Sequence, residues 1–252
     1  MRTLYLDLTN GVSADMFVAA CYALMNDDAK IDFEKWSGIA CKGLGVSIEL
    51  DEITEDGRNG FMISWLDEKS DGRPRNAKEA KSLLDAILTK IETSEKSNQY
   101  AIKVLDDIID VEAESHSVDR ERVHLHEIGR TTGMLNIALS SLCLDLLHIH
   151  DSEIVASYIS IGDGEIETSH GKLLVPAPAT VRLLKGLRFR FGPSEGEMAT
   201  PTGIAIMRNL IVHQNDMLPE SYQEGIGFGT RIFRGKRGYM RIFKSNEQSG
   251  AE

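Results

Sequence analysis

The chain has 252 residues and a formal net charge of −11 at pH 7, with 42% hydrophobic and 27% charged residues. This mixture is typical of a globular protein with a sizeable core and not of a disordered chain. Because like charges repel, so acidic a chain argues against binding to nucleic acid or to an anionic membrane surface. A divalent cation, or a small anion held by backbone amides, is compatible with this charge.

The three cysteines, Cys21, Cys41 and Cys143, show no close pairing along the chain. This pattern favours buried free thiols in a reducing compartment over disulfides or a thiolate zinc site. The first residues lack the long apolar stretch of a signal peptide. The most apolar segment, 134–149, is too short and too polar to span a bilayer. We therefore expect a cytoplasmic protein.

In the first half of the chain, residues 3–8 predict a short buried strand that ends at Asn10-Gly11. Ser13 then caps a helix whose first turn contains Asp15. The remaining elements expected here are a helix that begins after Asp32 and ends near Gly43 or Gly45, strands over 46–51 and 60–66 joined by a turn at Asp56-Gly57, and amphipathic helices around 83–91 and 102–109.

The second half predicts a strand over 123–128, a buried helix over 134–147, a strand over 154–161, helices that follow Val175 and Thr200, and two glycine-rich strands within 225–243. Strands and helices that mix without strict alternation predict an α+β fold, with a mixed β-sheet flanked by helices. We expect one region over residues 1–252, with 1–115 and 116–252 as candidate subdomains. The glycines of 225–229 do not form a dinucleotide fingerprint, because strand and not helix follows them.

The segment His124-Leu-His126-Glu127 is the sharpest local motif. Residues two apart on a strand share a face, so the two imidazoles could chelate a metal such as nickel or zinc. The alternative is a pair of partly buried histidines bonded to backbone. The similar pair His148 and His150 lies where a long helix ends, and there a capping role is favoured over metal binding.

A second motif, Thr200-Pro-Thr-Gly203, places proline in the first turn of a helix and hydroxyls beside free amides. It predicts either an anion site at the amides of 202–204, which Gly203 would leave open to a ligand, or a simple helix cap at Thr200. Asp7, at the end of the first strand, and Asp15 could converge at one edge of the sheet, where ligands often bind. Asp15 could equally be a first-turn residue that suits the helix dipole.

Five segments, at 5–17, 123–129, 169–180, 197–203 and 225–231, together cover nearly the whole chain in order. In this order they resemble the LarC family of nickel-insertion proteins. The resemblance implies a cyclometallase of the lyase class, which inserts nickel into a pyridinium bisthiocarboxylic acid mononucleotide. The product is the pincer cofactor of lactate racemase, with new metal–sulfur and metal–carbon bonds, and the family uses CTP and manganese.

The resemblance also implies roles for individual residues. The metal-handling candidates are His124, His126 and His170. Asp7, Asp15 and Glu127 are the acid/base candidates. The candidate anchors for the mononucleotide are Ser13, Thr200, Thr202 and Gly203.

Three departures from the family pattern stand out. Two aspartates of the family are replaced by Thr132 and Asn136, which lowers the expected cation affinity and removes two candidate bases. Ala14 stands where glycine is usual. The chain also stops soon after Arg231, whereas family members commonly continue into a domain that holds CTP. We therefore expect either a separate subunit that supplies this domain or an activity that is absent or different.

The sequence therefore predicts one subunit of a nickel-insertion cyclometallase, and leaves open whether it forms a homo-oligomer. A non-catalytic nickel or ligand carrier, or a regulatory paralogue, is the alternative that the lost carboxylates favour. A hydrolase acting on a nucleotide is a third candidate, since carboxylates beside an anion-binding turn would suit it too.

Overall fold

The structure, a computed structural model, describes residues 2–67, 75–126, 128–168, 171–220 and 222–245. Its helices are α1 (Ala14–Leu24), α2 (Asp27–Cys41), α3 (Ala77–Ile91), α4 (Glu95–His116), α5 (Thr131–Leu146), α6 (Pro178–Leu183) and α7 (Pro201–Arg208), with a 3-10 turn at Ile149–Asp151. Its strands are β1 (Arg2–Asp7), β2 (Val46–Glu55), β3 (Arg58–Asp67), β4 (Arg75–Asn76), β5 (His124–Leu125), β6 (Ser152–Ala156), β7 (Ile159–Ser160), β8 (Glu165–Thr168), β9 (Gly171–Leu174), β10 (Phe189–Arg190), β11 (His213–Gln214), β12 (Tyr222–Phe233) and β13 (Lys236–Ser245).

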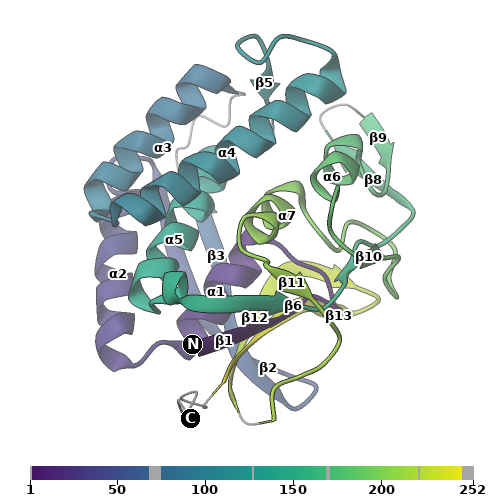
Figure 1. Ribbon diagram of the computed structural model, residues 1–252. Helices are drawn as coiled ribbons and strands as arrows, with labels where there is room; N and C mark the ends of the chain where they lie inside the picture. The colour runs from purple at the N-terminus through teal and green to yellow at the C-terminus, as the bar shows by residue number, and fades with distance from the viewer. Residues whose placement is uncertain (1, 68–74, 127, 169–170, 221, 246–252) are drawn as a thin grey trace.

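A mixed sheet of seven strands, in the order β11-β6-β1-β13-β12-β3-β2, forms the base of the molecule (Figure 1). β1 pairs with β6 in parallel and with β13 antiparallel, and β12 joins the β2–β3 hairpin through a parallel contact with β3. Strands from both ends of the chain thus alternate in one sheet. The α+β prediction is confirmed.

Helix α1 packs directly on β12, and glycines make this close approach possible. A Cβ atom at Gly227 would lie 1.9 Å from the carbonyl oxygen of Met16, and one at Gly225 would lie 2.4 Å from that of Ala20. Only glycine leaves enough room for a helix backbone this near to a strand. The glycine-rich segment therefore serves packing, and β12 continues through it as a strand, as the sequence predicts.

The helices form layers above the sheet. Helix α1 lies between the sheet and α5, and α5 in turn contacts α3 and α4 (Figure 1). Helix α5 is buried on nearly all sides, which confirms the prediction from its apolar sequence. The main core runs through these layers, and a smaller cluster of Tyr5, Val155 and Phe243 forms separately. All three cysteines are buried and free, as the sequence predicts.

Several predicted boundaries are wrong. Helix α2 begins at Asp27 instead of after Asp32, because the Asn26 side chain accepts a hydrogen bond from the amide of Ala29 and caps it. The strand predicted over 123–128 is reduced to His124–Leu125, paired with β4. Residue 115 falls in the last turn of α4, and the sheet takes strands from both sides of it; the candidate subdomains 1–115 and 116–252 stay a prediction.

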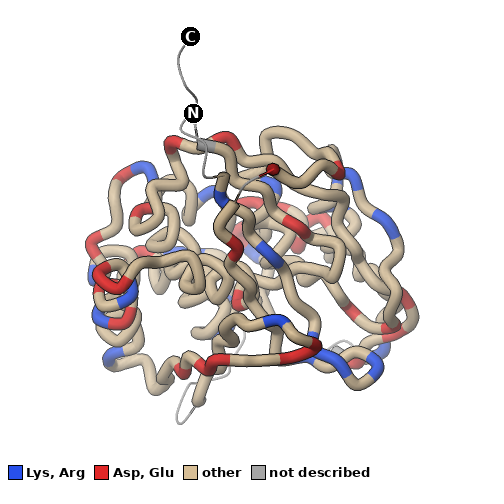
Figure 2. The backbone as a smooth tube through the Cα atoms, turned by 90° about the horizontal axis from the view of Figure 1, so that it is seen from below, with Lys and Arg blue, Asp and Glu red and all other residues tan. Residues whose placement is uncertain are grey.

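Lys and Arg are interspersed with Asp and Glu over much of the backbone trace (Figure 2). Within the described residues, no helix is long and apolar enough to cross a membrane.

Candidate functional site

A cavity of about 280 Å³ lies where all five family-like segments meet. Its polar lining includes Asp15, Glu112, His126, Glu197, Thr200 and Arg231. Among the described lining residues, three carboxylates face one arginine, so the cavity has an excess of negative charge. Such a lining attracts a cation.

The loop after β1 and the segment before α7 pair with each other and form one wall of the cavity. The amide of Val12 donates to the carbonyl of Met198 at 2.9 Å, and the amide of Thr200 donates to the carbonyl of Val12 at 2.9 Å. Gly11, with φ of +95°, makes the turn possible, because any Cβ there would lie 2.1 Å from the Met198 carbonyl oxygen. This pairing brings the start of α1 beside the start of α7.

A bulge in β12 carries Arg231 to the cavity. Strands β12 and β13 pair up to Phe228 opposite Tyr239 and resume with Ile232 opposite Arg237, so residues 229–231 face the single residue Gly238. Bulges of this kind redirect side chains and are frequent beside active sites.

Arg231 Nη1 lies 2.8 Å from Glu197 Oε2 and also donates to the Glu197 carbonyl at 3.3 Å. The Glu197 side chain is only 8% exposed, whereas that of Arg231 is 53% exposed. A carboxylate this buried depends on its partner, because an unpaired buried charge is costly. The pair therefore holds a charged carboxylate in the cavity wall while the arginine stays accessible.

Asp15 is the second carboxylate of this wall. Burial raises the pKa of Asp15, and hydrogen bonds from the Ser13 side chain and from backbone amides, together with the positive charge of Arg231, lower it in part. Ser13 occupies the N-cap position of α1, yet its side chain makes no capping bond and instead interacts with Asp15. A carboxyl group with a raised pKa is a stronger base once ionised, which suits proton transfer.

A smaller cavity of about 170 Å³ adjoins the first and shares Ser13, Asp15, Glu197, Thr200 and Arg231 with it. It continues past Gly229 to Phe233 and Gly238. The two cavities thus have a common wall of acidic and hydroxyl side chains.

The two histidines of the 123–129 segment lie in different places. His126 lines the cavity, whereas His124 is exposed and is not among the described lining residues. The two rings do not share a strand face, because β5 ends at Leu125 and His126 lies in a bend. The His126 ring centroid is 6.4 Å from that of His116, whose Nε2 is 3.4 Å from Glu112 Oε2.

The histidine segment is held by Arg75, which is only 8% exposed. Its guanidinium donates to the Gly129 carbonyl at 2.7 Å and to Thr131 Oγ1 at 3.1 Å. This anchors the start of α5 to the segment that bears His126. Glu127 and His170, predicted as an acid/base group and a metal ligand, lie outside the described residues.

The Thr200 turn is a helix cap. Thr200 Oγ1 accepts from the amide of Gly203 at 3.1 Å, and the amide of Ile204 donates to the Thr200 carbonyl at 2.9 Å. Two of the three amides expected to bind an anion therefore have partners within the protein. The expectation that Gly203 leaves space for a ligand is wrong, because a Cβ there would lie 2.7 Å from the carbonyl oxygen of Val12. Thr200 and Thr202 nevertheless line the cavity.

Thr132 and Asn136, the two positions at which the resemblance leads us to expect aspartates, both line the cavity near the start of α5. Asn136 Oδ1 accepts a hydrogen bond from Trp65 Nε1 at 3.2 Å. The Asn136 side chain thus joins α5 to β3, and both residues are uncharged.

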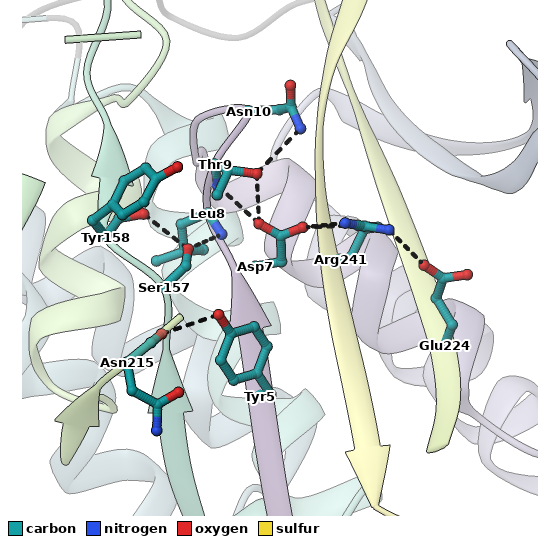
Figure 3. A network of polar contacts seen from close by, with 10 residues as sticks. All are labelled: Tyr5, Asp7, Leu8, Thr9, Asn10, Ser157, Tyr158, Asn215, Glu224 and Arg241. Atoms are coloured by element: carbon teal, nitrogen blue, oxygen red, sulfur yellow. Dashed lines mark hydrogen bonds and ion pairs between the residues drawn. The ribbon is translucent and has the colours of Figure 1, made fainter. Parts of the chain in front are cut away.

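Asp7 does not belong to this cavity's described lining. Its Oδ2 accepts from Arg241 Nε at 2.8 Å and its Oδ1 accepts from the amide of Thr9 at 3.0 Å and from Thr9 Oγ1 at 2.6 Å (Figure 3). Arg241 also reaches Glu224 at 3.4 Å. Asp7 joins β1 to β13 and fixes the turn that leads to Gly11, so it supports the site from a distance.

The His148 and His150 pair follows the structural alternative. His150 Nε2 lies 2.6 Å from Ser97 Oγ, and Ser97 Oγ donates to Asp145 Oδ1 at 2.6 Å. This cluster joins the start of α4 to the end of α5.

Glu112, Glu197 and Arg231 are cavity residues that the sequence argument did not select. Glu197 begins the segment 197–203 and Arg231 ends the segment 225–231, so their membership of these segments could have identified them. Among the described residues, no group of three or more His, Cys, Asp or Glu side chains is arranged to hold a metal ion. The described lining does contain individual side chains of the kind that bind metal ions, His126 and the three carboxylates.

The family model of nickel insertion proteins matches residues 4–252. A putative nickel insertion protein of Dictyoglomus thermophilum is 30% identical over 233 residues, which cover 91% of this chain and 56% of the relative. One from Myxococcus xanthus is 29% identical over 243 residues, with coverages of 95% and 60%.

A pyridinium-3,5-bisthiocarboxylic acid mononucleotide nickel insertion protein of a Thermotoga species (strain RQ2) is 27% identical over 267 residues, which cover 99% of this chain and 64% of the relative. The chain therefore spans about 56–64% of the length of these three relatives. No solved structure matches it. Since the family match extends over nearly every residue, the chain belongs to the nickel insertion protein family.

Proposed function

We propose that this chain takes part in inserting nickel into a pyridinium bisthiocarboxylic acid mononucleotide, the reactant in the name of the Thermotoga relative. One observation carries the proposal: five family-like segments that are far apart in the sequence meet at one acidic cavity, whose lining includes Asp15, His126, Glu197 and Arg231. Nickel is the cargo in this reaction, so the protein need not hold it permanently.

The cavity fits a transient nickel ion. Imidazole and carboxylate groups both bind nickel(II), and His126 with Glu197 or Glu112 offers such ligands. We propose that the two thiocarboxylate sulfurs of the mononucleotide supply further ligands, since sulfur donors bind metal ions of this kind as well. Metal and mononucleotide would then bind best together.

We assign Asp15 as the base for the ring proton. When nickel(II) bonds to the ring carbon, the electron pair of the C–H bond becomes the metal–carbon bond and the proton leaves, with no change of oxidation state. Asp15 accepts this proton, since its burial makes its carboxylate more basic than usual. Arg231 pairs with Glu197 in the same wall, and its half-exposed guanidinium can also contact the anionic reactant.

CTP, manganese and a CTP-binding partner subunit are expectations from the family resemblance and remain predictions here. The test is to measure nickel transfer by the purified chain with CTP and manganese, with and without a companion protein from the same cells. Mass spectrometry should detect a nickel-bearing mononucleotide in the presence of the companion and none with the chain alone. Transfer by the chain alone would contradict the need for a partner.

A non-catalytic carrier is the second candidate, and the neutral Thr132 and Asn136 favour it, because they leave that wall without the charges that raise cation affinity. The two functions differ in one measurable respect. A carrier retains nickel or the mononucleotide through gel filtration but leaves the ring C–H bond intact. Deuterium at the reacting ring carbon would then never be lost to solvent.

A further inference from the structure

Two exposed hairpin turns meet beside the site and are held together. The β2–β3 turn has Asp56 and Gly57 at φ of +52° and +73°, and the β12–β13 turn has Arg234 and Gly235 at φ of +49° and +82°. Consecutive positive φ angles are the signature of tight two-residue hairpin turns. Lys236 Nζ lies 2.6 Å from Asp56 Oδ2, and the amide of Arg237 donates to Glu55 Oε1 at 2.9 Å. These bonds fix one turn against the other.

A cleft of about 430 Å³ between the turns is lined by four cations, Arg58, Arg234, Lys236 and Arg237. Asp56 is the one carboxylate in its described lining, and it is already paired with Lys236. The Arg58 guanidinium lies 4.9 Å from the centroid of the Tyr239 ring. Within the described parts of the chain, the Arg234 and Arg237 guanidinium groups have no hydrogen-bond or ion-pair partner. The cleft is thus positive on a chain whose net charge is −11.

This cleft is continuous with the site. It shares Met198, Phe233 and Gly238 with the smaller cavity, which in turn shares Asp15 and Arg231 with the larger one. A ligand could therefore extend from the acidic cavity into the basic cleft. The two ends have opposite charge, as expected for a reactant that meets a cation at one end and carries an anionic group at the other.

We propose that the cleft between the hairpin turns binds the phosphate group of the ligand whose ring enters the acidic cavity. Guanidinium groups bind phosphate oxygens with paired, charge-assisted hydrogen bonds, and Arg234 and Arg237 are available for them. The Thr200 turn is less suited, because the amides of Gly203 and Ile204 are already bonded. The inference rests on the proposed function for the identity of the ligand, a mononucleotide.

The test uses two probes that differ only in the phosphate. Nicotinamide mononucleotide is a pyridinium mononucleotide, and nicotinamide riboside is the same compound without phosphate. Calorimetry should show the wild-type chain binding the mononucleotide at least about tenfold more tightly than the riboside, the scale of a hydrogen bond to a charged group. In a variant with Arg234→Gln and Arg237→Gln, this preference should fall to less than about twofold.

Lys103→Gln, which removes an exposed cation on α4, is the control and should keep the wild-type preference. Inorganic phosphate should compete with the mononucleotide in the wild type and not in the double variant, which separates binding of the phosphate from binding of the ring. The inference is overturned if the wild type shows no preference or no binding, or if the preference persists in the double variant. Loss of the preference in Thr202→Val alone would then place the phosphate at the Thr200 turn.

Failure of the proposed function gives a different result. If the phosphate preference depends on Arg234 and Arg237 but no nickel enters the mononucleotide, phosphate binding in the cleft is supported and the proposed reaction is refuted. If nickel enters the mononucleotide but the chain shows no preference for the phosphate, the proposed reaction is supported and the cleft does not bind the phosphate.

Discussion

Replacing Gly227 with alanine should displace helix α1 from the sheet and disturb the site at its start. The new Cβ would lie 1.9 Å from the Met16 carbonyl oxygen and 2.6 Å from the amide nitrogen of Ala20. An ordinary carbon–oxygen contact is about 3.3 Å, so the helix backbone must retreat by about 1.4 Å, the difference between the two distances. Both obstacles are backbone atoms, which no side-chain rotation can remove.

Overpacking of this kind typically costs 1–3 kcal/mol, and here a value of about 3 kcal/mol or more is expected because a whole helix must move. For a chain of this length, that loss lowers Tm by roughly 6–12 °C. The assay is thermal unfolding followed by circular dichroism. Asp15 lies in the first turn of the displaced helix, so nickel transfer should fall as well.

Gly38→Ala is the matched control, since a Cβ there has no heavy atom within 4 Å and the residue lies in an exposed part of α2. It should stabilise the helix by about 0.5–1 kcal/mol and raise Tm slightly. A Gly227→Ala variant that melts within about 2 °C of the wild type would refute the account of how α1 meets β12.

Three further substitutions test the site itself. Burial raises the pKa of Asp15 above its ordinary 3.8, so the stabilisation from the protonated carboxyl group is complete below that value and is lost as pH rises through the raised pKa. Asp15→Asn should therefore raise Tm relative to the wild type at neutral pH but not near about pH 3.5. The same variant should abolish nickel transfer. Arg231→Gln should lower the free energy of unfolding in urea by about 1–3 kcal/mol, less than the loss of a fully buried ion pair, because the arginine is half exposed. The loss should be smaller in a Glu197→Gln background, and an equal loss in both backgrounds would show that the two residues are not coupled. His126→Ala should weaken nickel binding about tenfold in calorimetry, the loss typical of a ligand contact, and an equal loss in His124→Ala would show that both rings bind the ion.

Much of the fold was predictable because its signals are local. Helix α5 is apolar all round and therefore buried, and the Asp56-Gly57 turn between two alternating segments predicts a hairpin. The mixed sheet could be predicted because strands and helices do not alternate strictly along the chain. Its strand order did not, because the parallel contact of β12 with β3 joins residues far apart in sequence.

The site was predictable only in part, because a cavity is made by tertiary contacts. The Thr200 cap and the position of Asp15 on α1 follow from local sequence. Arg231 depends on a bulge in β12, and Glu197 depends on the pairing of two loops, which no short pattern reveals. His124 and His126 separate because β5 ends after two residues, whereas the spacing argument assumed a longer strand.

The central claim is that the cavity around Asp15 transfers nickel to the mononucleotide. The most direct test is the amount of nickel-bearing mononucleotide, measured by mass spectrometry in the native host after this chain has been deleted, because any partner is then present. The account predicts that the product is lost on deletion, restored by the wild-type chain and by Gly38→Ala, and not restored by a stably folded Asp15→Asn chain. Product that persists without the chain, or returns in full with Asp15→Asn, would contradict it.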